Sequence, residues 1–459
     1  MDIEAIVIGS GFGGAVAALR LGEAGIETLV LERGKRWPIA PTEDTFAPGS
    51  APDGRSAWLR TQWSGRPIER HTGVRDMVEA DGITVIQGTG VGGGSLVHAA
   101  ITVQPGREEM RRSFGDVVDY DEMDSVYFPR ARTLLGATPI PDDILAMPCC
   151  AGARTFLAQA EAAGFAPQRL ALAVDWDVVR AELAGTKKKS WVIGEFTTNS
   201  GAKNTLDRNY LCGAEATGHV RVLPLHRVVA ITETAEKTFR VTFERIDDGG
   251  GVVARGGLVC RRLFLAAGSL GTTELLLRAR ETKTLPHVSA GVGQSWGTNG
   301  DRFVATAVEA RMVAGAALAH LDNPFGPVLL EDMPNVRFSV GLGSASGVFH
   351  YDRARDTVTL EWRPDEADLA VTRAAVHTNE LFATRNGLPP SAVADGSRTV
   401  HPLGGASMGR VCDSFGRVFG HRGLYVVDSA LLPGHCAAVN PSLTIAALAE
   451  RSLATVLGD

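Results

Sequence analysis

The first 34 residues alternate apolar runs and glycines in the order of a β-α-β unit. Ile3–Ile8 is an apolar run of strand length that breaks at Gly9. Ala15–Leu21 carries the small and apolar residues typical of a helix packed closely on a strand, and Gly25 ends that helix. Glu27–Glu32 is the second predicted strand. The pattern therefore predicts two parallel strands joined by a crossover helix.

Strands return in the middle of the chain after a largely helical stretch. The pattern predicts one strand at Ile83–Gln87, then a glycine-rich run, then helices separated by polar turns to about residue 185. Beyond Asn204 five more strands are predicted, of which the third and fourth form a hairpin pair: His219–Pro224, Arg227–Ile231, Phe239–Arg245, Gly251–Val259 and Arg262–Ala267. The last strand runs into a sharp turn, Gly268–Gly271, and a helix is predicted from Thr272. We expect these elements to complete the N-terminal unit.

The C-terminal part alternates apolar and polar positions over Val304–Ala394. This alternation predicts a hairpin of Val348–Tyr351 and Thr357–Trp362 around the turn Asp352–Asp356, as part of an antiparallel sheet. A closing helix is predicted from about Ser442 to Leu457.

One long segment, Lys35–Gly82, is rich in proline and lacks regular periodicity. It holds Trp37, Trp58 and Trp63. One interpretation is a lid whose aromatic side chains cover an apolar ligand. The other is that the tryptophans fix the loop to the body of the protein.

Composition narrows the class of protein. A chain of 459 residues is too long for one core of ordinary size, which predicts two domains or one large composite. The net charge of −6 argues against nucleic acid as the main partner. The six cysteines are scattered without metal-ligand spacing, so no metal site is expected and free thiols are favoured.

The pattern predicts neither a membrane span nor an export signal. No apolar run reaches about 18 residues, and Met1 leads directly into a predicted core strand without a basic and apolar leader. We expect a cytoplasmic protein without a transmembrane segment. Transient contact with a membrane and the oligomeric state stay open.

The glycines that follow the first predicted strand are the first residues with a predicted chemical role. Gly9, Gly11 and Gly14 stand in the order GxGxxG. In this motif the first glycine permits a tight turn, the second lets a pyrophosphate approach the backbone, and the third lets helix and strand pack closely. Glu32 ends the second strand, where an acid binds both ribose hydroxyls and selects against a 2′-phosphate. The motif predicts FAD or NAD binding, and the alternative is an ordinary structural turn.

A second glycine-rich run follows the strand Ile83–Gln87. Five of the seven residues from Gly88 to Gly94 are glycine. We interpret this run as a loop that cannot form a packed element and that presses its backbone against a flat or charged ligand. It leads through Ser95 to the polar side chain of His98.

These blocks, in this order, resemble the glucose-methanol-choline (GMC) flavoprotein oxidoreductases, and within them the cholesterol oxidase branch. The matching segments span the chain: Ile8–Leu21, Gly90–Val97, Ala267–Gly271 with Thr273–Leu276, Gly297–Gly300, His401–Gly405, Gly423–Asp428 and Asn440–Ile445.

The resemblance implies an α/β fold with two domains. An FAD-binding, Rossmann-like domain is expected from three discontinuous segments, residues 1–42, 204–302 and 410–459. An α+β substrate-binding domain, with a largely antiparallel sheet facing the flavin, is expected from residues 43–203 and 303–409.

The resemblance also implies FAD as the cofactor. It places the adenosine ribose near Glu32, adenine near the backbone around Val228, the flavin side near Gly92–Ser95, and the ribityl-phosphate region near Asp428. The full set of expected FAD contacts is Gly9, Gly11, Phe12, Gly14, Glu32, Gly92, Gly93, Gly94, Ser95, His98, Val228, Gly268, Asp428 and Asn440.

Oxidation of an alcohol calls for an imidazole and a second hydrogen-bonding group that converge on the hydroxyl. His401 and Asn440 match the family's catalytic pair. Pro441 restricts the residue before it to an extended backbone, which would aim Asn440 into the site. The alternatives are a buried structural histidine at His401 and a helix N-cap at Asn440.

The cholesterol oxidase branch also carries a glutamate that shuttles a proton and moves a steroid double bond. Leu329–Pro334 is the best local match and gives this role to Glu331, whose pKa would be raised in an apolar pocket. A surface position is the alternative for Glu331.

The chain departs from the branch at several points. His98 stands where the branch usually has asparagine, and Ser442 stands where it often has an aromatic residue. The substrate-domain segments are also shorter. For His98 the alternatives are a covalent link to FAD and a hydrogen-bonding or packing role.

The expected function is FAD-dependent oxidation of a secondary, bulky apolar alcohol, such as a 3β-hydroxysteroid, to a ketone. Steroid double-bond isomerisation and reoxidation by oxygen to hydrogen peroxide are further expectations. The expected partners are a small apolar alcohol and an electron acceptor, either oxygen or another. The alternatives are a GMC enzyme for a different alcohol with another acceptor, and a catalytically silent flavin-binding protein.

Overall fold

The structure, a computed structural model, describes residues 3–40, 43–305, 312–334, 336–389 and 396–458. Parts of the predicted alternating region, residues 306–311, 335 and 390–394, lie outside the described residues.

The N-terminal β-α-β unit forms as predicted. β1 (Ile3–Ile8) and β2 (Thr28–Leu31) pair in parallel, and α1 (Phe12–Glu23) joins them. Ala15–Ala18 is fully buried, because its small side chains let α1 lie close to the sheet.

β1 and β2 belong to a seven-stranded sheet with the order β11-β2-β1-β14-β13-β12, in which β22 also pairs with β14. Its other strands are β11 (Val220–Leu223), β12 (His226–Glu233), β13 (Phe239–Ile246), β14 (Val252–Leu265) and β22 (Leu424–Val426). β11, β2, β1, the end of β14 and β22 run parallel, whereas β12, β13 and β14 form an antiparallel ladder. The sheet thus draws on all three segments expected for the nucleotide domain, while the domain boundaries stay a prediction.

β14 corrects one expectation from the sequence. The two strands predicted over Gly251–Val259 and Arg262–Ala267 are a single strand of 14 residues. Its first part pairs antiparallel with β13, and its last part, from Cys260 to Leu265, pairs in parallel with β1. The prediction is wrong because the side chains change from exposed to buried near Cys260 without any turn in the backbone.

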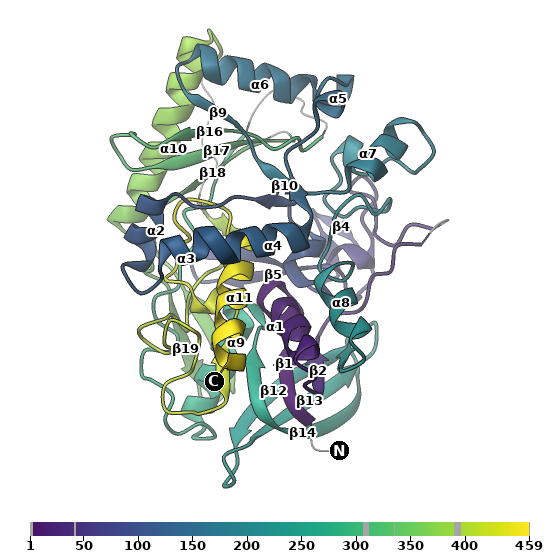
Figure 1. The fold of residues 1–459 in the computed structure, drawn as a ribbon, viewed down its shortest axis with the longest axis vertical. Coiled ribbons are helices and arrows are strands. Elements are labelled where there is room, and N and C mark those ends of the chain that lie inside the picture. Colours follow the sequence, from purple (N-terminus) through teal and green to yellow (C-terminus); the bar gives the residue numbers. More distant parts are fainter. Residues whose placement is uncertain (1–2, 41–42, 306–311, 335, 390–395, 459) are drawn as a thin grey trace.

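Helices flank this sheet. α11 (Ser442–Gly458) is the predicted closing helix and lies beside α1 (Figure 1). The buried carboxylate of Glu450 on α11 accepts two hydrogen bonds of 2.7 Å from the Arg20 guanidinium on α1. α9 (Gly268–Glu281) begins four residues before the predicted start at Thr272, so Gly268–Gly271 is its first turn.

Five antiparallel strands form a second sheet in the upper half of Figure 1, with the order β15-β18-β17-β16-β9. They are β15 (Arg302–Ala305), β16 (Ala316–His320), β17 (Val328–Met333), β18 (Val336–Gly341) and β9 (Ala166–Arg169). α6 (Ala151–Ala162) and α10 (Glu366–Arg385) pack against this sheet. β9 belongs to the predicted segment 43–203 and β16 to the segment 303–409, so their pairing joins the two.

The alternation over Val304–Ala394 misses α10. Asp365 caps this helix by accepting hydrogen bonds from the backbone N–H groups of Ala367 and Asp368, a local signal of a helix start. Likewise, the stretch predicted as helical to residue 185 also contains short strands: β7 (Ile101–Thr102), β8 (Ala137–Thr138), β9 and β10 (Ala171–Ala173).

The predicted hairpin is confirmed as β19 (Val348–Asp352) and β20 (Thr357–Glu361). It forms a two-stranded sheet of its own rather than part of the larger antiparallel sheet. The remaining helices are α2 (Arg107–Phe114), α3 (Tyr120–Glu122), α4 (Phe128–Leu135), α5 (Asp142–Leu145), α7 (Trp176–Leu183) and α8 (Tyr210–Ala216).

The irregular segment Lys35–Gly82 contains short strands. β3 (Gln62–Trp63) pairs with β4 (Arg66–Pro67). β5 (Arg75–Ala80), β6 (Ile83–Gly88) and β21 (Arg398–Thr399) form a three-stranded sheet. Trp37 and Trp58 are buried, which favours the interpretation that they fix this segment to the body.

Candidate active site

A buried carboxylate holds the His401 imidazole. His401 follows β21, and its Nδ1 lies 2.8 Å from Oδ1 of Asp301, which is fully buried. Oδ2 of Asp301 accepts hydrogen bonds from the Thr399 hydroxyl and from the backbone N–H groups of Val400 and His401. Because Nδ1 donates to Asp301, Nε2 of the neutral ring is left as the acceptor.

Asn440 lies at the end of a loop that another asparagine fixes. Asn299 donates from Nδ2 to the Val439 carbonyl and accepts at Oδ1 from the Cys436 N–H. Asn440 is buried, and its Oδ1 has no hydrogen-bond partner among the described residues. Oδ1 therefore does not cap α11, which begins at Ser442.

Glu331 is buried in the middle of the second sheet, on β17. Burial raises the pKa of its carboxyl, the Asn440 amide counteracts part of this shift, and the nearby Asp301 carboxylate adds to it, so that the resulting pKa is about 8. The alternative of a surface glutamate is thus wrong, and Glu331 is protonated at neutral pH.

An aromatic side chain links Glu331 to His401. Phe338 on β18 stands directly opposite Glu331, and its ring contacts the His401 imidazole edge-on at a centroid distance of 5.4 Å. Phe303 packs beside Phe338 at 4.9 Å. The structure therefore places Glu331 near both Asn440 and Asp301, Asp301 against His401, and Phe338 beside His401 and Glu331.

Each glycine of the N-terminal motif has a distinct geometry. Gly9 adopts a φ of +97°, which favours glycine. A Cβ at Gly14 would overlap the carbonyl oxygen of Gly9, so α1 can approach β1 only without a side chain there. A Cβ at Gly11 would meet nothing within 4 Å. The motif thus combines a tight turn, an open position and a close helix contact, as its expected role requires.

Glu32 binds the chain itself at the start of this loop. Its Oε2 accepts hydrogen bonds from the N–H and hydroxyl of Ser10, and its Oε1 accepts from the Gly34 N–H. A carboxylate has about four acceptor positions, so further hydrogen bonds remain available to it. Its contact with a ribose stays a prediction.

The second glycine-rich run contacts the first. The expectation that it cannot form a packed element is wrong, because the short helix η2 (Gly93–Leu96) begins within it. A Cβ at Gly93 would lie 2.7 Å from the Gly11 Cα, whereas a Cβ at Gly94 would meet nothing within 4 Å. The Ser95 hydroxyl closes the turn by donating to the Gly92 carbonyl.

His98 follows this run, and one of its two ring nitrogens has no hydrogen-bond partner among the described residues. Its Nδ1 lies 3.0 Å from the Ser95 carbonyl oxygen, and its ring contacts Phe12 edge-on at 5.6 Å. Its Nε2 is buried and unpaired among the described residues. Burial, and then the positive charge of Lys203 and the nearby His401, lower the pKa of His98 well below its usual value.

Asp428 connects two distant segments. Its Oδ2 accepts hydrogen bonds from the Gly268 N–H and the Thr272 hydroxyl at the start of α9, and its Oδ1 accepts from the Ala430 N–H. Burial raises the pKa of Asp428 to about 6. Val228 lies apart on β12, at the edge of the first sheet. The contacts of Gly268, Asp428 and Val228 with FAD stay predictions.

The residues present fit FAD. Gly11 and Gly94 leave open space on two runs that touch each other, and His98 Nε2 and Asn440 Oδ1 are buried polar atoms without partners in the described part of the chain. A cofactor with phosphates and a flat polar ring system would satisfy both features.

The sequence missed two buried charged residues of this region. Asp301 directly follows the segment Gly297–Gly300 noted above, and the signal for it was a charge adjoining that motif. Lys203, 1% exposed, donates to the carbonyls of Leu96 and His98, and nothing local in the sequence marks it as buried.

The sequence predicts neither a metal site nor a membrane span, and both features can be searched for in the described residues. Within them no group of three or more histidines, cysteines or acids could hold a metal ion, and no helix is both long and apolar enough to cross a membrane.

The chain is similar to known proteins over its whole length. The family model described as GMC oxidoreductase matches residues 346–449. A cholesterol oxidase of Acinetobacter baumannii is 26% identical in an alignment covering 99% of this chain and 94% of that protein. A cholesterol oxidase of Mycobacterium tuberculosis (strain CDC 1551 / Oshkosh) is 25% identical over 98% of this chain and 90% of that protein.

Solved structures share the fold at low identity. A pyridoxine 4-oxidase from Mesorbium loti superposes with a TM-score of 0.69 at 16% identity, covering 100% of both chains. A fungal aryl-alcohol oxidase superposes with a TM-score of 0.68 at 14% identity, covering 100% of this chain and 99% of that one. These likenesses establish the fold expected from the sequence.

Proposed function

We propose that this chain, which belongs to the GMC oxidoreductases and is an FAD-dependent oxidoreductase acting on alcohols, oxidises a bulky apolar secondary alcohol to a ketone. The family and the cofactor expected from the sequence are thereby confirmed. The substrate class and the roles of individual residues are the proposal.

The arrangement around Asp301 carries this proposal. Asp301 fixes the His401 tautomer, so that Nε2 accepts the hydroxyl proton of the alcohol. The Asp301 carboxylate then stabilises the imidazolium that forms. FAD, when bound, accepts the hydride from the alcohol carbon.

Asn440 supplies the second group at the substrate oxygen. We propose that Asn440 donates one amide N–H to the Glu331 carboxyl, because its amide lowers the Glu331 pKa. The other amide N–H then points toward the alcohol oxygen and stabilises the charge that develops as the proton leaves. Loss of the Glu331 proton would place a negative charge beside this amide and oppose that stabilisation.

The substrate class rests on the surroundings. Phe303 and Phe338 form an aromatic wall beside His401, and the full-length relatives are named cholesterol oxidases. The raised pKa of Glu331 suits a proton shuttle, which supports double-bond isomerisation as part of the proposal.

Other alcohols form the second candidate, because structures of the same fold are named pyridoxine 4-oxidase and aryl-alcohol oxidase. The alignment with the A. baumannii relative spans 546 positions against 459 residues in this chain, so that relative carries additional residues. Shorter segments would reshape the substrate site without removing the chemistry.

The test is an anaerobic screen of purified yellow protein against steroid, terpenoid, sugar, aliphatic, aryl and pyridine alcohols. Bleaching of the flavin by a 3β-hydroxysteroid supports the proposal, and bleaching by another class alone selects the second candidate. Flavin that no alcohol bleaches would instead support a silent flavin-binding protein. Oxygen uptake and peroxide release after reduction identify the acceptor.

The proposed residues are tested with variants. His401→Asn and Asn440→Leu are expected to slow flavin reduction by about 100-fold or more while FAD stays bound. The matched control is His350→Asn, which changes an exposed histidine on β19. Rates equal to the control in both variants would remove His401 and Asn440 from the mechanism.

The His98 alternatives need one further measurement. Acid precipitation that leaves all the flavin in the supernatant excludes a covalent link, whereas flavin retained in the pellet and lost in His98→Asn establishes one.

A further inference from the structure

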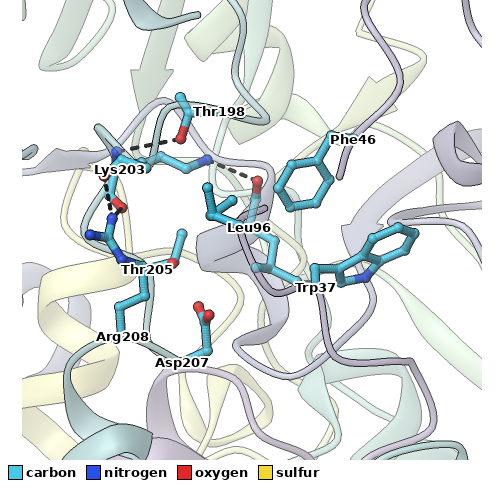
Figure 2. A pocket seen from close by; sticks show the side chains of 10 residues that line it. Trp37, Phe46, Leu96, Thr198, Lys203, Thr205, Asp207 and Arg208 are labelled. Carbon is cyan, nitrogen blue, oxygen red and sulfur yellow. Dashed lines mark hydrogen bonds between the residues drawn. The ribbon is translucent and has the colours of Figure 1, made fainter. Parts of the chain in front are cut away.

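Lys203 places a buried ammonium directly behind the run that ends at His98. Its Nζ donates to the carbonyl oxygens of Leu96 and His98, each at 2.9 Å, and to that of Phe196. Figure 2 shows the side chain extended toward the Leu96 carbonyl. Three acceptors require three N–H donors, which only the charged form of lysine has.

The immediate surroundings leave this charge without an ion pair among the described residues. Burial and the nearby Arg75 lower the pKa of Lys203 well below its usual value, and Asp207 counteracts part of this shift. Asp207 is itself largely buried, and its Oδ1 has no hydrogen-bond partner in the described chain. The carbonyl hydrogen bonds are therefore the direct contacts that stabilise the Lys203 ammonium.

Lys203 acts on His98 in two ways. By binding the carbonyls on either side of Val97, it fixes the backbone that carries the imidazole. Burial of the ring is the main cause that opposes a proton on it, and the positive charge of Lys203 and then the nearby His401 add to this effect. The remaining contacts of His98, with the Ser95 carbonyl and the Phe12 ring, are uncharged.

We propose that Lys203 is a positioning residue of the flavin site: it fixes the run Leu96–His98 and keeps the His98 imidazole neutral, so that Nε2 is an acceptor facing the cofactor. This inference rests on the proposed function, which places the flavin against Gly92–Ser95. A fixed positive charge behind that run also favours the added negative charge of reduced flavin, and so raises its midpoint potential.

Two substitutions separate the charge from the hydrogen bonds. Lys203→Gln keeps amide N–H donors and loses the charge, whereas Lys203→Arg keeps both. Lys187→Gln is the matched control, because Lys187 precedes the same segment and donates to one backbone carbonyl, that of Ser200.

The first measurement is the midpoint potential of the bound flavin. Lys203→Gln is expected to shift it to a more negative value, and Lys203→Arg and Lys187→Gln are expected to leave it near that of the wild type. A potential that is the same in Lys203→Gln and in the control would overturn the electrostatic role.

The second measurement follows the His98 ring by NMR of protein labelled with ¹³C-histidine, with His98→Asn identifying the resonance. In the wild-type holoenzyme the ring is expected to stay neutral through the pH range in which an ordinary histidine titrates. In Lys203→Gln it is expected to titrate closer to the ordinary histidine pKa of about 6.5. If Lys203→Gln does not fold, the wild type alone decides: a His98 ring that titrates near 6.5 there contradicts the proposal.

Failure of this inference differs from failure of the proposed function. If the protein binds flavin that an alcohol bleaches, but the midpoint potential and the His98 titration are the same in Lys203→Gln as in the wild type, only the proposed role of Lys203 is wrong. Protein that binds no flavin removes the proposed function first.

Discussion

Replacing Asp301 by asparagine tests the proposed mechanism at its most constrained point. Oδ2 of Asp301 accepts three hydrogen bonds, from the Thr399 hydroxyl and the Val400 and His401 N–H groups. In Asp301→Asn the amide oxygen must take that position, because an NH2 group there would face three donors. The amide NH2 then faces His401 Nδ1, which must become an acceptor, and the ring proton moves to Nε2. His401 would keep its place and lose its function as a base.

The magnitude follows from that change of tautomer. General base catalysis by a positioned side chain contributes about 10²- to 10⁴-fold, or about 3 to 5 kcal/mol of activation free energy. We therefore expect flavin reduction in Asp301→Asn to slow by about 10²- to 10⁴-fold. FAD should stay bound, since the expected cofactor contacts lie on other residues.

The assay is anaerobic stopped-flow reduction of the bound flavin by the best alcohol from the screen. Asp332→Asn is the matched control: Asp332 is the next residue on β17, and burial raises its pKa to about 6, but it interacts with Arg337 rather than His401. A reduction rate in Asp301→Asn within about threefold of this control would refute the tautomer argument.

Three further predictions concern Glu331 and the glycine motif. The pKa of Glu331 is about 8 in the folded chain and near 4.5 in the unfolded chain, so between these values the folded chain keeps a proton that the unfolded chain loses. The free energy of unfolding should therefore fall by a few kcal/mol as the pH rises from about 4.5 to about 8. Glu331→Gln should remove this fall in denaturant unfolding compared at pH 5 and 8.5, and an equal fall in both proteins would contradict it. The flavin reduction rate should decline as pH rises through about 8 and stay level in Glu331→Gln, whereas a decline in both would assign it to another group. Gly11→Ala should weaken FAD binding without changing the stability of the apoprotein. Gly14→Ala should destabilise the apoprotein by about 1 to 3 kcal/mol, because the new Cβ overlaps the Gly9 carbonyl oxygen. Calorimetry with and without FAD distinguishes the two results.

The parts of the fold that the sequence predicted are those whose signals are local. The β-α-β unit and the β19–β20 hairpin each combine a periodic pattern with turn residues at the boundaries, and both form as expected. β14 and α10 were missed because their identity depends on what packs against them: one strand serves two ladders, and the helix covers a sheet.

In the candidate site, too, residues marked by local motifs were predicted and residues defined by tertiary contacts were not. His401 and Asn440 stand in recognisable motifs, but no pattern connects either of them with Asp301, which meets His401 across 100 residues of sequence. Lys203 was missed because lysine is usually exposed, and its burial is made possible by backbone carbonyls from two other segments. Contacts of this kind are set by tertiary structure, so the sequence alone could not supply them.

The two carboxyl groups of the site differ in surroundings, and this difference assigns their roles. Asp301 accepts four hydrogen bonds from residues 399–401, including the imidazole, which suits a fixed negative charge beside a base. Glu331 has no hydrogen bond of ordinary geometry within the described chain, and it is pushed toward the protonated form by burial and by Asp301 itself. Two acids close together therefore have different surroundings, one held by four hydrogen bonds and the other buried with a raised pKa. In the proposed mechanism this difference leaves His401 as the base and Asn440 as the hydrogen-bond donor to the alcohol oxygen, the two groups that withdrawal of an alcohol proton requires.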